Sequence, residues 1–404
     1  MVILVRFSKH VPNPGGISEA NVEKTPPFGN IAFPEFFNYS QPLLLHTMKH
    51  ATNFIPGPSQ LYFTVSDYIR QALRDGIPSL SHRSTAFEKI FAEASENIRA
   101  LLELPGSFTI LFCASATEIW ERIIQNLTAE HSVHLSTGAF GRRFHETALQ
   151  LKRMAIVFQK PDGEGFTEAP EIPSTELIAI THNETSTGVV TPPRVISSVK
   201  STNASALVAV DAVSSLPHPQ FNYTSIDTLF FSVQKGFGLP AGLGVWIVNE
   251  RCLAKEAELR SRGLSTGSYH SLESLTKYAR KNQTPETPNV LGIYLLAKVT
   301  ADMLRRGIAT IRRETEYKAA LLYHSLETHA HIRPFVQNPA LRSPTVVVAE
   351  TGMHTDRIYR QLLQKSILPG EGYGPLKART LRFANFPAHS KEQVELLADE
   401  LLQL

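Results

Sequence analysis

The sequence of 404 residues has little of several features that mark particular classes of protein. Its two cysteines, Cys113 and Cys252, are too few for a disulfide framework and lack the spacing of a metal site. No apolar run approaches the roughly 20 residues that a membrane-spanning helix needs. No block rich in Lys and Arg indicates nucleic-acid binding. We therefore expect a protein of the reducing cytoplasm that holds no metal and has neither a membrane nor a nucleic-acid partner.

An excess of charge of either sign is also lacking, since 40 Lys and Arg residues nearly balance 37 Asp and Glu residues. The net charge of +3 gives only a faint bias toward anionic partners, and small anionic substrates are compatible with it. The hydrophobic content of 42% in so long a chain is enough for a large core. Composition alone therefore predicts a globular protein with two lobes.

One lysine stands in an unusual setting. Lys235 lies between two apolar, β-prone runs, and four glycines follow it closely. Either it ends a strand and reaches solvent, or burial lowers its pKa until the neutral amine can form a Schiff base with pyridoxal phosphate. The glycines favour the second interpretation, because a backbone without Cβ atoms lets a bulky cofactor approach. A dinucleotide-binding loop is excluded, because the glycine spacing is wrong and Pro240 opposes the helix that must begin there.

A carboxylate that suits such a cofactor lies upstream. Asp211 ends the apolar run 206–210, which predicts a buried parallel strand whose last side chain lies at the sheet edge where ligands bind. There it could keep a pyridine nitrogen protonated, so that the ring acts as an electron sink. The alternative is an aspartate that caps the next turn. Because Asp211 and Lys235 are about one strand-crossover-strand unit apart, we favour a shared site.

Three motifs resemble those of the class V pyridoxal-phosphate-dependent aminotransferases: HNETSTGV at 182–189, VDAVSS at 210–215 and SVQKGFGLPAGLG at 232–244. The resemblance extends from about Lys49 to the C-terminus and is greatest to the phosphoserine aminotransferase branch. It implies an α/β protein of fold type I and a homodimer with shared active sites. We expect a mostly parallel seven-stranded sheet in a large domain, 48–289, and a smaller α+β domain, 290–404.

Residues 1–47 differ from the rest because they show no sustained helical or strand period. Segments rich in Pro and Gly, such as 12–16 and 26–29, predict irregular or disordered chain. The family resemblance begins after this stretch, so one interpretation is an upstream extension that is not native. A targeting peptide is the alternative, although acidic residues such as Glu19 and Glu23 are unusual in one.

The resemblance also implies roles for residues at the ends of predicted strands. Lys235 would hold the cofactor and act as general base and acid, while Asp211 would face the ring nitrogen. Ala116 and Thr117 follow a buried strand and begin a helix, where free backbone amides suit the cofactor phosphate. Phe140 would stack on the pyridine ring, although most phenylalanines only fill the core.

Further cofactor contacts are implied at Thr185, Gln234 and Thr287. Thr287 would reach the neighbouring subunit's cofactor phosphate, whereas on pattern alone its turn could simply begin a helix. Glu286 stands where the phosphoserine branch usually has asparagine, and an acid there would repel a phosphate unless it points away. His182 has no second ligand at a workable spacing, so we interpret it as a structural histidine.

Three residues are candidates for binding the substrate. Arg382 has the planar fork that pairs with the carboxylate of every amino acid. His82 and Arg83 resemble the family's substrate loop, which reaches into the partner subunit's active site. Without the resemblance, either arginine could be a solvated surface residue.

We therefore predict transamination between an amino acid and a 2-oxo acid, with phosphoserine and 2-oxoglutarate as the first choice, in serine biosynthesis. An alanine-glyoxylate or serine-pyruvate type is the alternative, because residues 375–376 read Pro-Leu in place of the phosphoserine branch's histidine-arginine pair. The Pro-Gly-Pro entry at 56–58 also resembles that alternative branch. A noncatalytic binding protein of the same fold would be expected to lose Lys235 or Asp211, and a cysteine desulfurase needs a cysteine beyond Cys252.

Overall fold

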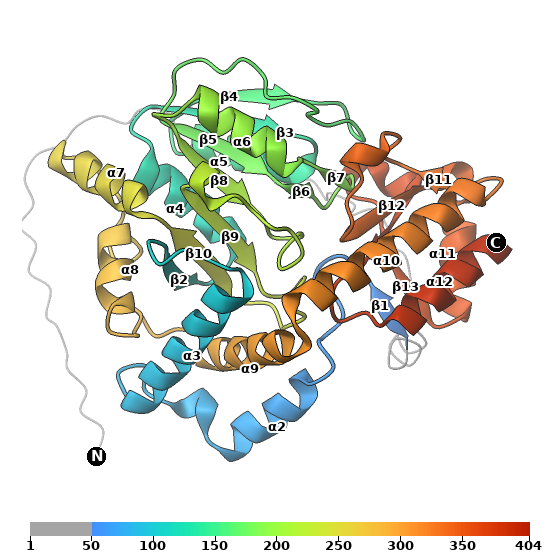
Figure 1. Ribbon diagram of the computed structural model, residues 1–404, viewed down its shortest axis with the longest axis horizontal. Helices are drawn as coiled ribbons and strands as arrows, with labels where there is room; N and C mark the ends of the chain where they lie inside the picture. Colours follow the sequence, from blue (N-terminus) through green and yellow to red (C-terminus); the bar gives the residue numbers. More distant parts are fainter. Residues whose placement is uncertain (1–50) are drawn as a thin grey trace, which may run out of the picture. The chain divides into compact units, whose positions relative to one another are not determined.

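The computed structural model describes residues 51–404, and the extension predicted at 1–47 lies outside these residues. A seven-stranded sheet runs through the larger part of the described chain (Figure 1). In spatial order its strands are β2 (Thr109–Cys113), β10 (Gly244–Val248), β9 (Thr228–Ser232), β8 (Leu207–Asp211), β5 (Leu177–Thr181), β3 (His131–Ser136) and β4 (Met154–Gln159). Only β10 runs antiparallel to its neighbours. The predicted mostly parallel sheet is confirmed.

Helices cover both faces of this sheet. Successive side chains of a strand point to opposite faces, so each strand contributes apolar side chains to both helical layers. On one face, Val208 and Phe231 pack with α3 (Thr85–Leu101), α6 (Pro193–Thr202) and α9 (Val290–Arg306). On the other face, Ala209 and Phe230 pack with a second group of helices. These are α4 (Ala116–Leu127), α5 (Ala139–Gln150), α7 (Glu250–Ser261) and α8 (Leu272–Ala279). The strands β5, β8, β9 and β10 are therefore buried at every position, as expected of a sheet between two helical layers.

A second, five-stranded sheet is built mostly from the C-terminal part of the chain. Its order is β1 (Thr52–Phe54), β13 (Ile367–Glu371), β14 (Thr380–Ala384), β12 (Val346–Glu350) and β11 (Arg333–Pro334). The helices α10 (Ile308–Thr328), α11 (Thr355–Gln364) and α12 (Lys391–Gln403) supply the rest of its core. This is the predicted smaller α+β part, although β1 joins it from far upstream. The domain limits given above stay a prediction.

The remaining elements are short. They are α2 (Val65–Arg74), the hairpin of β6 (Asn183–Glu184) and β7 (Val189–Val190), and the 3-10 helices η1 (Ile77–Ser79), η2 (Tyr223–Ser225), η3 (Pro339–Leu341), η4 (Gly352–His354) and η5 (Gly374–Ala378). Within residues 51–404, no helix combines the length and apolar character that a membrane crossing requires.

The register of the large sheet brings strand ends together. Thr181 at the end of β5 pairs with Asp211 at the end of β8, and Asp211 pairs with Phe230 of β9. The segments that follow these strands, including Lys235 after β9, therefore leave the sheet at one edge.

Candidate active site

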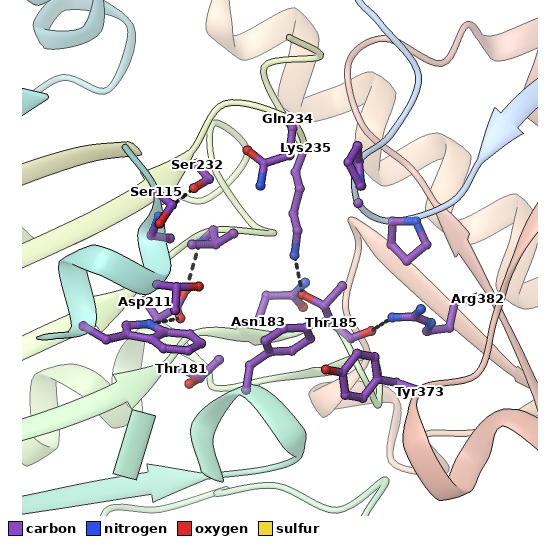
Figure 2. Close-up of a pocket in the computed structure, with 18 residues that line it drawn as sticks. Ser115, Thr181, Asn183, Thr185, Asp211, Ser232, Gln234, Lys235, Tyr373 and Arg382 are labelled. Carbon is purple, nitrogen blue, oxygen red and sulfur yellow. Dashed lines mark hydrogen bonds between the residues drawn. The ribbon is translucent and has the colours of Figure 1, made fainter. Parts of the chain in front are cut away.

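A cavity of about 220 Å³ opens at the carboxyl edge of the large sheet (Figure 2). Its wall includes the start of α4, the ends of β5, β8 and β9, and the loop 56–58. Two side chains come from the smaller sheet: Tyr373, which follows β13, and Arg382, which is in β14. The lining includes eight residues predicted from the sequence: Ala116, Thr117, Phe140, Thr185, Asp211, Gln234, Lys235 and Arg382.

The amine of Lys235 is inside the protein. The residue is 7% exposed, and its Nζ donates a hydrogen bond of 3.0 Å to Thr185 Oγ1. Burial lowers the pKa of Lys235 to about 8, against the opposing effect of the Asp211 charge. A Cβ atom at Gly57 would lie 2.7 Å from Lys235 Cε, and Gly57 has a φ of +152°, so a side chain at this position would be strained and would displace the lysine side chain. The side chain thus does not reach solvent, and a neutral amine is accessible near physiological pH.

Asp211 is buried at the other end of the cavity, 3% exposed. Its Oδ1 accepts a hydrogen bond of 3.0 Å from the Val213 N–H, and its Oδ2 accepts one of 3.1 Å from Trp120 Nε1. Burial raises the pKa of Asp211 to about 6, although the Val213 N–H, the Lys235 charge and the Trp120 N–H all act in the opposite direction. The carboxylate is therefore mostly ionised at neutral pH and is poised to hold a proton on a partner atom.

The start of α4 forms another part of the wall. Ser115 caps the helix by accepting a hydrogen bond of 3.1 Å from Glu118 N, and Ala116 N donates one of 2.8 Å to Ser232 Oγ. The first N–H groups of a helix and its dipole favour an anion. Nearby, Gln234 Oε1 is buried without a hydrogen-bond partner. The start of α4 is therefore suited to an oxyanion, whereas Gln234 Oε1 needs a hydrogen-bond donor.

Aromatic side chains lie on the side toward the smaller sheet. The ring of Phe140 lies 5.1 Å from that of Tyr373 and 5.2 Å from Lys235 Nζ. Phe140 is placed by Glu184, whose Oε2 accepts hydrogen bonds of 3.1 Å from both Phe140 N and Gly141 N at the start of α5. A flat apolar face is therefore held beside the lysine amine.

Arg382 brings a cation to the same cavity from β14. Its Nε donates a hydrogen bond of 2.7 Å to Glu371 O, and its Nη1 donates one of 3.2 Å to Thr185 O. Burial lowers the pKa of Arg382 to about 10, so the guanidinium is still charged at neutral pH. These two backbone bonds fix the plane of the fork, and the cavity therefore has a rigid cationic group.

Three predicted residues, His82, Arg83 and Thr287, are not part of this wall. The guanidinium of Arg83 is engaged by its own chain, because its Nη1 donates to Thr284 O at 2.6 Å and its Nη2 donates to Pro285 O at 2.9 Å. The predicted roles of all three residues involve a partner subunit and stay predictions.

The sequence reading did not assign Trp120, Ser232 or Tyr373 to the site. Trp120 lies four residues after Ala116, so helical spacing places both side chains on one face of α4. This spacing could have predicted Trp120 from the sequence. Ser232 is the last residue of β9 and could have been found by the same strand-end rule as Asp211. Tyr373 comes from the smaller sheet and has no local signal. Asn183, which was expected to shape a turn, lines the cavity as well.

Potential metal ligands do not gather at this site or elsewhere in the part of the chain that the structure describes, since no group of three His, Cys, Asp or Glu side chains could hold an ion there. His182 is buried against Phe221, with ring centroids 4.9 Å apart, and burial lowers its pKa to about 3. It is therefore neutral and packed in the core.

Known proteins resemble this chain over most of its length. The family model for aminotransferase class-V matches residues 52–372. A phosphoserine aminotransferase from Rhodococcus opacus is 29% identical over 328 residues, which are 80% of this chain and 86% of that protein. The crystal structure of a phosphoserine aminotransferase from Cytophaga hutchinsonii is 47% identical, has a TM-score of 0.86, and covers 88% of this chain and 99% of its own.

A more distant structure, an alanine–glyoxylate aminotransferase from Nostoc sp., is 21% identical with a TM-score of 0.74 over 88% of this chain and 95% of its own. At that identity the likeness shows the fold alone.

Proposed function

This chain belongs to the aminotransferase class-V family and is an aminotransferase, and on that premise we propose that pyridoxal 5'-phosphate is its cofactor and that phosphoserine and 2-oxoglutarate are its substrates, in serine biosynthesis. The observation that carries the proposal is the buried pair of Lys235 and Asp211, which line one cavity together with the start of α4. The names of the relatives from Rhodococcus opacus and Cytophaga hutchinsonii support the choice of substrate.

The residues of the cavity fit pyridoxal phosphate. The start of α4 offers N–H groups to its phosphate, and the unpartnered Gln234 Oε1 can accept a hydrogen bond from a water or hydroxyl group beside it. Phe140 offers a flat face for the ring, and Asp211 offers a carboxylate for the ring nitrogen. When bound, the cofactor supplies an electron sink for the carbanion that forms at the substrate Cα.

The chain's own residues perform the proton transfers and the positioning. Lys235, with its pKa near 8, is a base that can accept a proton from the substrate Cα and would then deliver it to the C4′ carbon of the cofactor. Thr185 directs its amine, because Thr185 Oγ1 is itself fixed by a hydrogen bond of 2.8 Å to Ser214 Oγ. Asp211 holds a proton at the ring nitrogen, and Arg382 binds the substrate carboxylate. The same groups serve the amino acid and the oxo acid in turn.

We also propose that the enzyme is a cytoplasmic homodimer in which His82, Arg83 and Thr287 act at the neighbouring active site. Their position outside the cavity of their own chain is compatible with this arrangement. The proposed sharing of active sites involves only these three residues among residues 51–404.

A second candidate function is transamination of the alanine-glyoxylate or serine-pyruvate type. The segment after Tyr373 favours this function, because a substrate phosphate would need a cationic side chain there to bind it. Lys377 lies 3.1 Å from Glu371 and Arg379 lies 3.6 Å from Glu350, and neither lines the cavity. Neither cation is therefore placed to bind a substrate phosphate, whereas a substrate without a phosphate needs no cation in this part of the site.

A substrate panel distinguishes the two functions. Purified enzyme is given phosphoserine, alanine or serine with 2-oxoglutarate, glyoxylate or pyruvate, and ketoacid release is measured. We expect the highest kcat/KM with phosphoserine and 2-oxoglutarate. An enzyme that turns over alanine with glyoxylate but leaves phosphoserine untouched would establish the second function instead.

Replacing Arg382 by Lys should raise KM for both the amino acid and the oxo acid by about 10- to 100-fold, because a bidentate pair with the carboxylate becomes a single contact. We expect kcat to change less, since the carboxylate is not the reacting group. Steady-state kinetics measure both constants. Arg379→Lys is the matched control, because Arg379 is a nearby arginine outside the cavity. Equal KM values in wild type and Arg382→Lys would remove Arg382 from the substrate site.

A further inference from the structure

Three ionisable side chains that the proposed mechanism does not use meet beside the start of α4. His270 is 6% exposed and lies between two glutamates. Its Nδ1 is in direct contact with Glu118 Oε1, and its Nε2 lies 3.3 Å from Glu286 Oε2. Glu118 is fixed in turn, because its Oε2 accepts a hydrogen bond of 2.8 Å from Ala114 N. The three groups therefore form one connected cluster, which we call the His270 clamp.

The central ring of the His270 clamp is cationic at neutral pH. Burial alone would lower the pKa of His270, but the hydrogen bond with Glu118 and the charges of Glu118 and Glu286 outweigh it and raise the pKa to about 9. One imidazolium between two carboxylates leaves a single net negative charge. The other groups that face the clamp are the ring of Tyr269 against His270, Arg122 and Cys113 near Glu118, and His82 near Glu286.

The His270 clamp joins two segments that the proposed function places at cofactor phosphates: the start of α4 at the phosphate of its own chain, and Thr287 at the phosphate of the neighbouring subunit. Glu118 is in the first turn of α4, directly after Ala116 and Thr117 in the cavity wall. Glu286 lies in the turn 284–287, immediately before Thr287. Arg83 holds the same turn through its bonds to Thr284 O and Pro285 O. An unpaired glutamate in this turn would repel an anion, whereas here its carboxylate is paired with an imidazolium.

We propose that His270 is a positioning residue that holds the turn 284–287 against the start of α4 and offsets the charge of Glu286 next to Thr287, where the neighbouring subunit's cofactor phosphate binds. The proposal rests on the proposed function, because it assumes that pyridoxal phosphate is the cofactor and that Thr287 reaches its phosphate in the neighbouring subunit. It explains how this chain keeps a glutamate at a position where an acid would otherwise weaken the site.

Binding of pyridoxal phosphate to cofactor-free protein at pH 7.5 tests the proposal, with pyridoxal, which has no phosphate, as the control ligand. His270→Gln leaves two negative charges in the clamp, Glu286→Gln leaves none, and the double variant restores the single charge of the wild type. We expect His270→Gln to bind pyridoxal phosphate about tenfold more weakly, Glu286→Gln to bind it at least as tightly as wild type, and the double variant to lie within about threefold of wild type. Pyridoxal should bind all four proteins equally.

Each part of the experiment has a distinct meaning. If wild type does not bind pyridoxal phosphate, the proposed function fails and the inference fails with it. If wild type binds but His270→Gln binds equally well, only the inference is overturned. Equal weakening in His270→Gln and the double variant, with pyridoxal weakened too, would also overturn it, because that pattern reports damage to the fold. If His270→Gln does not fold, weaker binding by Glu286→Gln would overturn it.

A melting experiment on the cofactor-free protein gives an independent readout. Because the pKa of folded His270 is raised from 6.5 to about 9, its ion pairs stabilise the fold fully below pH 6.5 and lose this effect as pH rises through about 9. The difference in Tm between wild type and His270→Gln should therefore shrink over that window. His131→Gln is the matched control, since His131 lies 3.6 Å from Glu130 at the surface and should show no such trend. A difference in Tm that is constant from pH 6 to 10 would argue against a charged clamp.

Discussion

The Lys235→Ala variant should lose transamination by roughly 10⁴-fold or more, because it removes both the amine that holds the cofactor and the base that moves the proton at the substrate Cα. The purified variant should also lack the visible absorbance of a cofactor bound covalently to lysine. Single-turnover kinetics and an absorbance spectrum measure the two effects. Retention of turnover by Lys235→Ala would refute the assignment of this residue.

Lys318 offers a matched control for this prediction. It is 1% exposed, and burial lowers its pKa to about 8, as it does for Lys235. Its Nζ donates to Phe386 O at 3.2 Å and to His389 O at 2.8 Å, away from the cavity. Lys318→Met should therefore lower the Tm but keep the activity of the protein that remains folded. A comparison of the two variants separates the loss of a buried charge from the loss of the reacting amine.

The Asp211→Asn variant should lose about 10²- to 10³-fold in kcat/KM while still binding cofactor, because an amide of the same shape cannot keep the ring nitrogen protonated. Kinetics of the variant, with cofactor content measured in parallel, give both quantities. Turnover equal to wild type in a fully loaded Asp211→Asn preparation would remove Asp211 from the mechanism.

Trp120→Phe should have a smaller effect in the same direction. It removes the Nε1–H donor to Asp211 Oδ2 and leaves Val213 N as the hydrogen-bond donor to this carboxylate. We expect roughly a 5- to 20-fold loss in kcat/KM at neutral pH. The pKa of Asp211, already about 6, should rise further without this donor, so the acid limb of the pH-rate profile should move to higher pH. A profile that does not move would show that Trp120 does not stabilise the carboxylate.

The depressed pKa of Lys235 is not what identifies it. Lys318 has the same shift, yet its amine is bound by two carbonyl oxygens in the core. What distinguishes Lys235 is its place after a strand of a parallel sheet, at the edge where Asp211 also ends a strand. That position could be read from the sequence, because apolar runs and the residues that end them are local features.

Arg83 shows where local reasoning stops. Its residue type predicts a fork for a substrate's oxygens, which stays a prediction, and within its own chain the fork binds Gln283 Oε1, Thr284 O and Pro285 O, some 200 residues away in sequence. The same holds for β1, which pairs with β13 through Thr52 and Ile367. Contacts over such separations depend on the whole arrangement of elements, which periodicity does not encode.

The sequence by itself determined the sheet class and the two residues at its carboxyl edge, because hydrophobic period and strand ends are properties of a short stretch of chain. Tertiary structure alone decided that Trp120 bonds to Asp211, that Tyr373 and Arg382 come to the cavity from the smaller part of the chain, and that His270 lies between Glu118 and Glu286. The physical reason is that these pairings depend on how distant elements pack, so that each side chain's charge and burial follow from neighbours that its own segment does not specify.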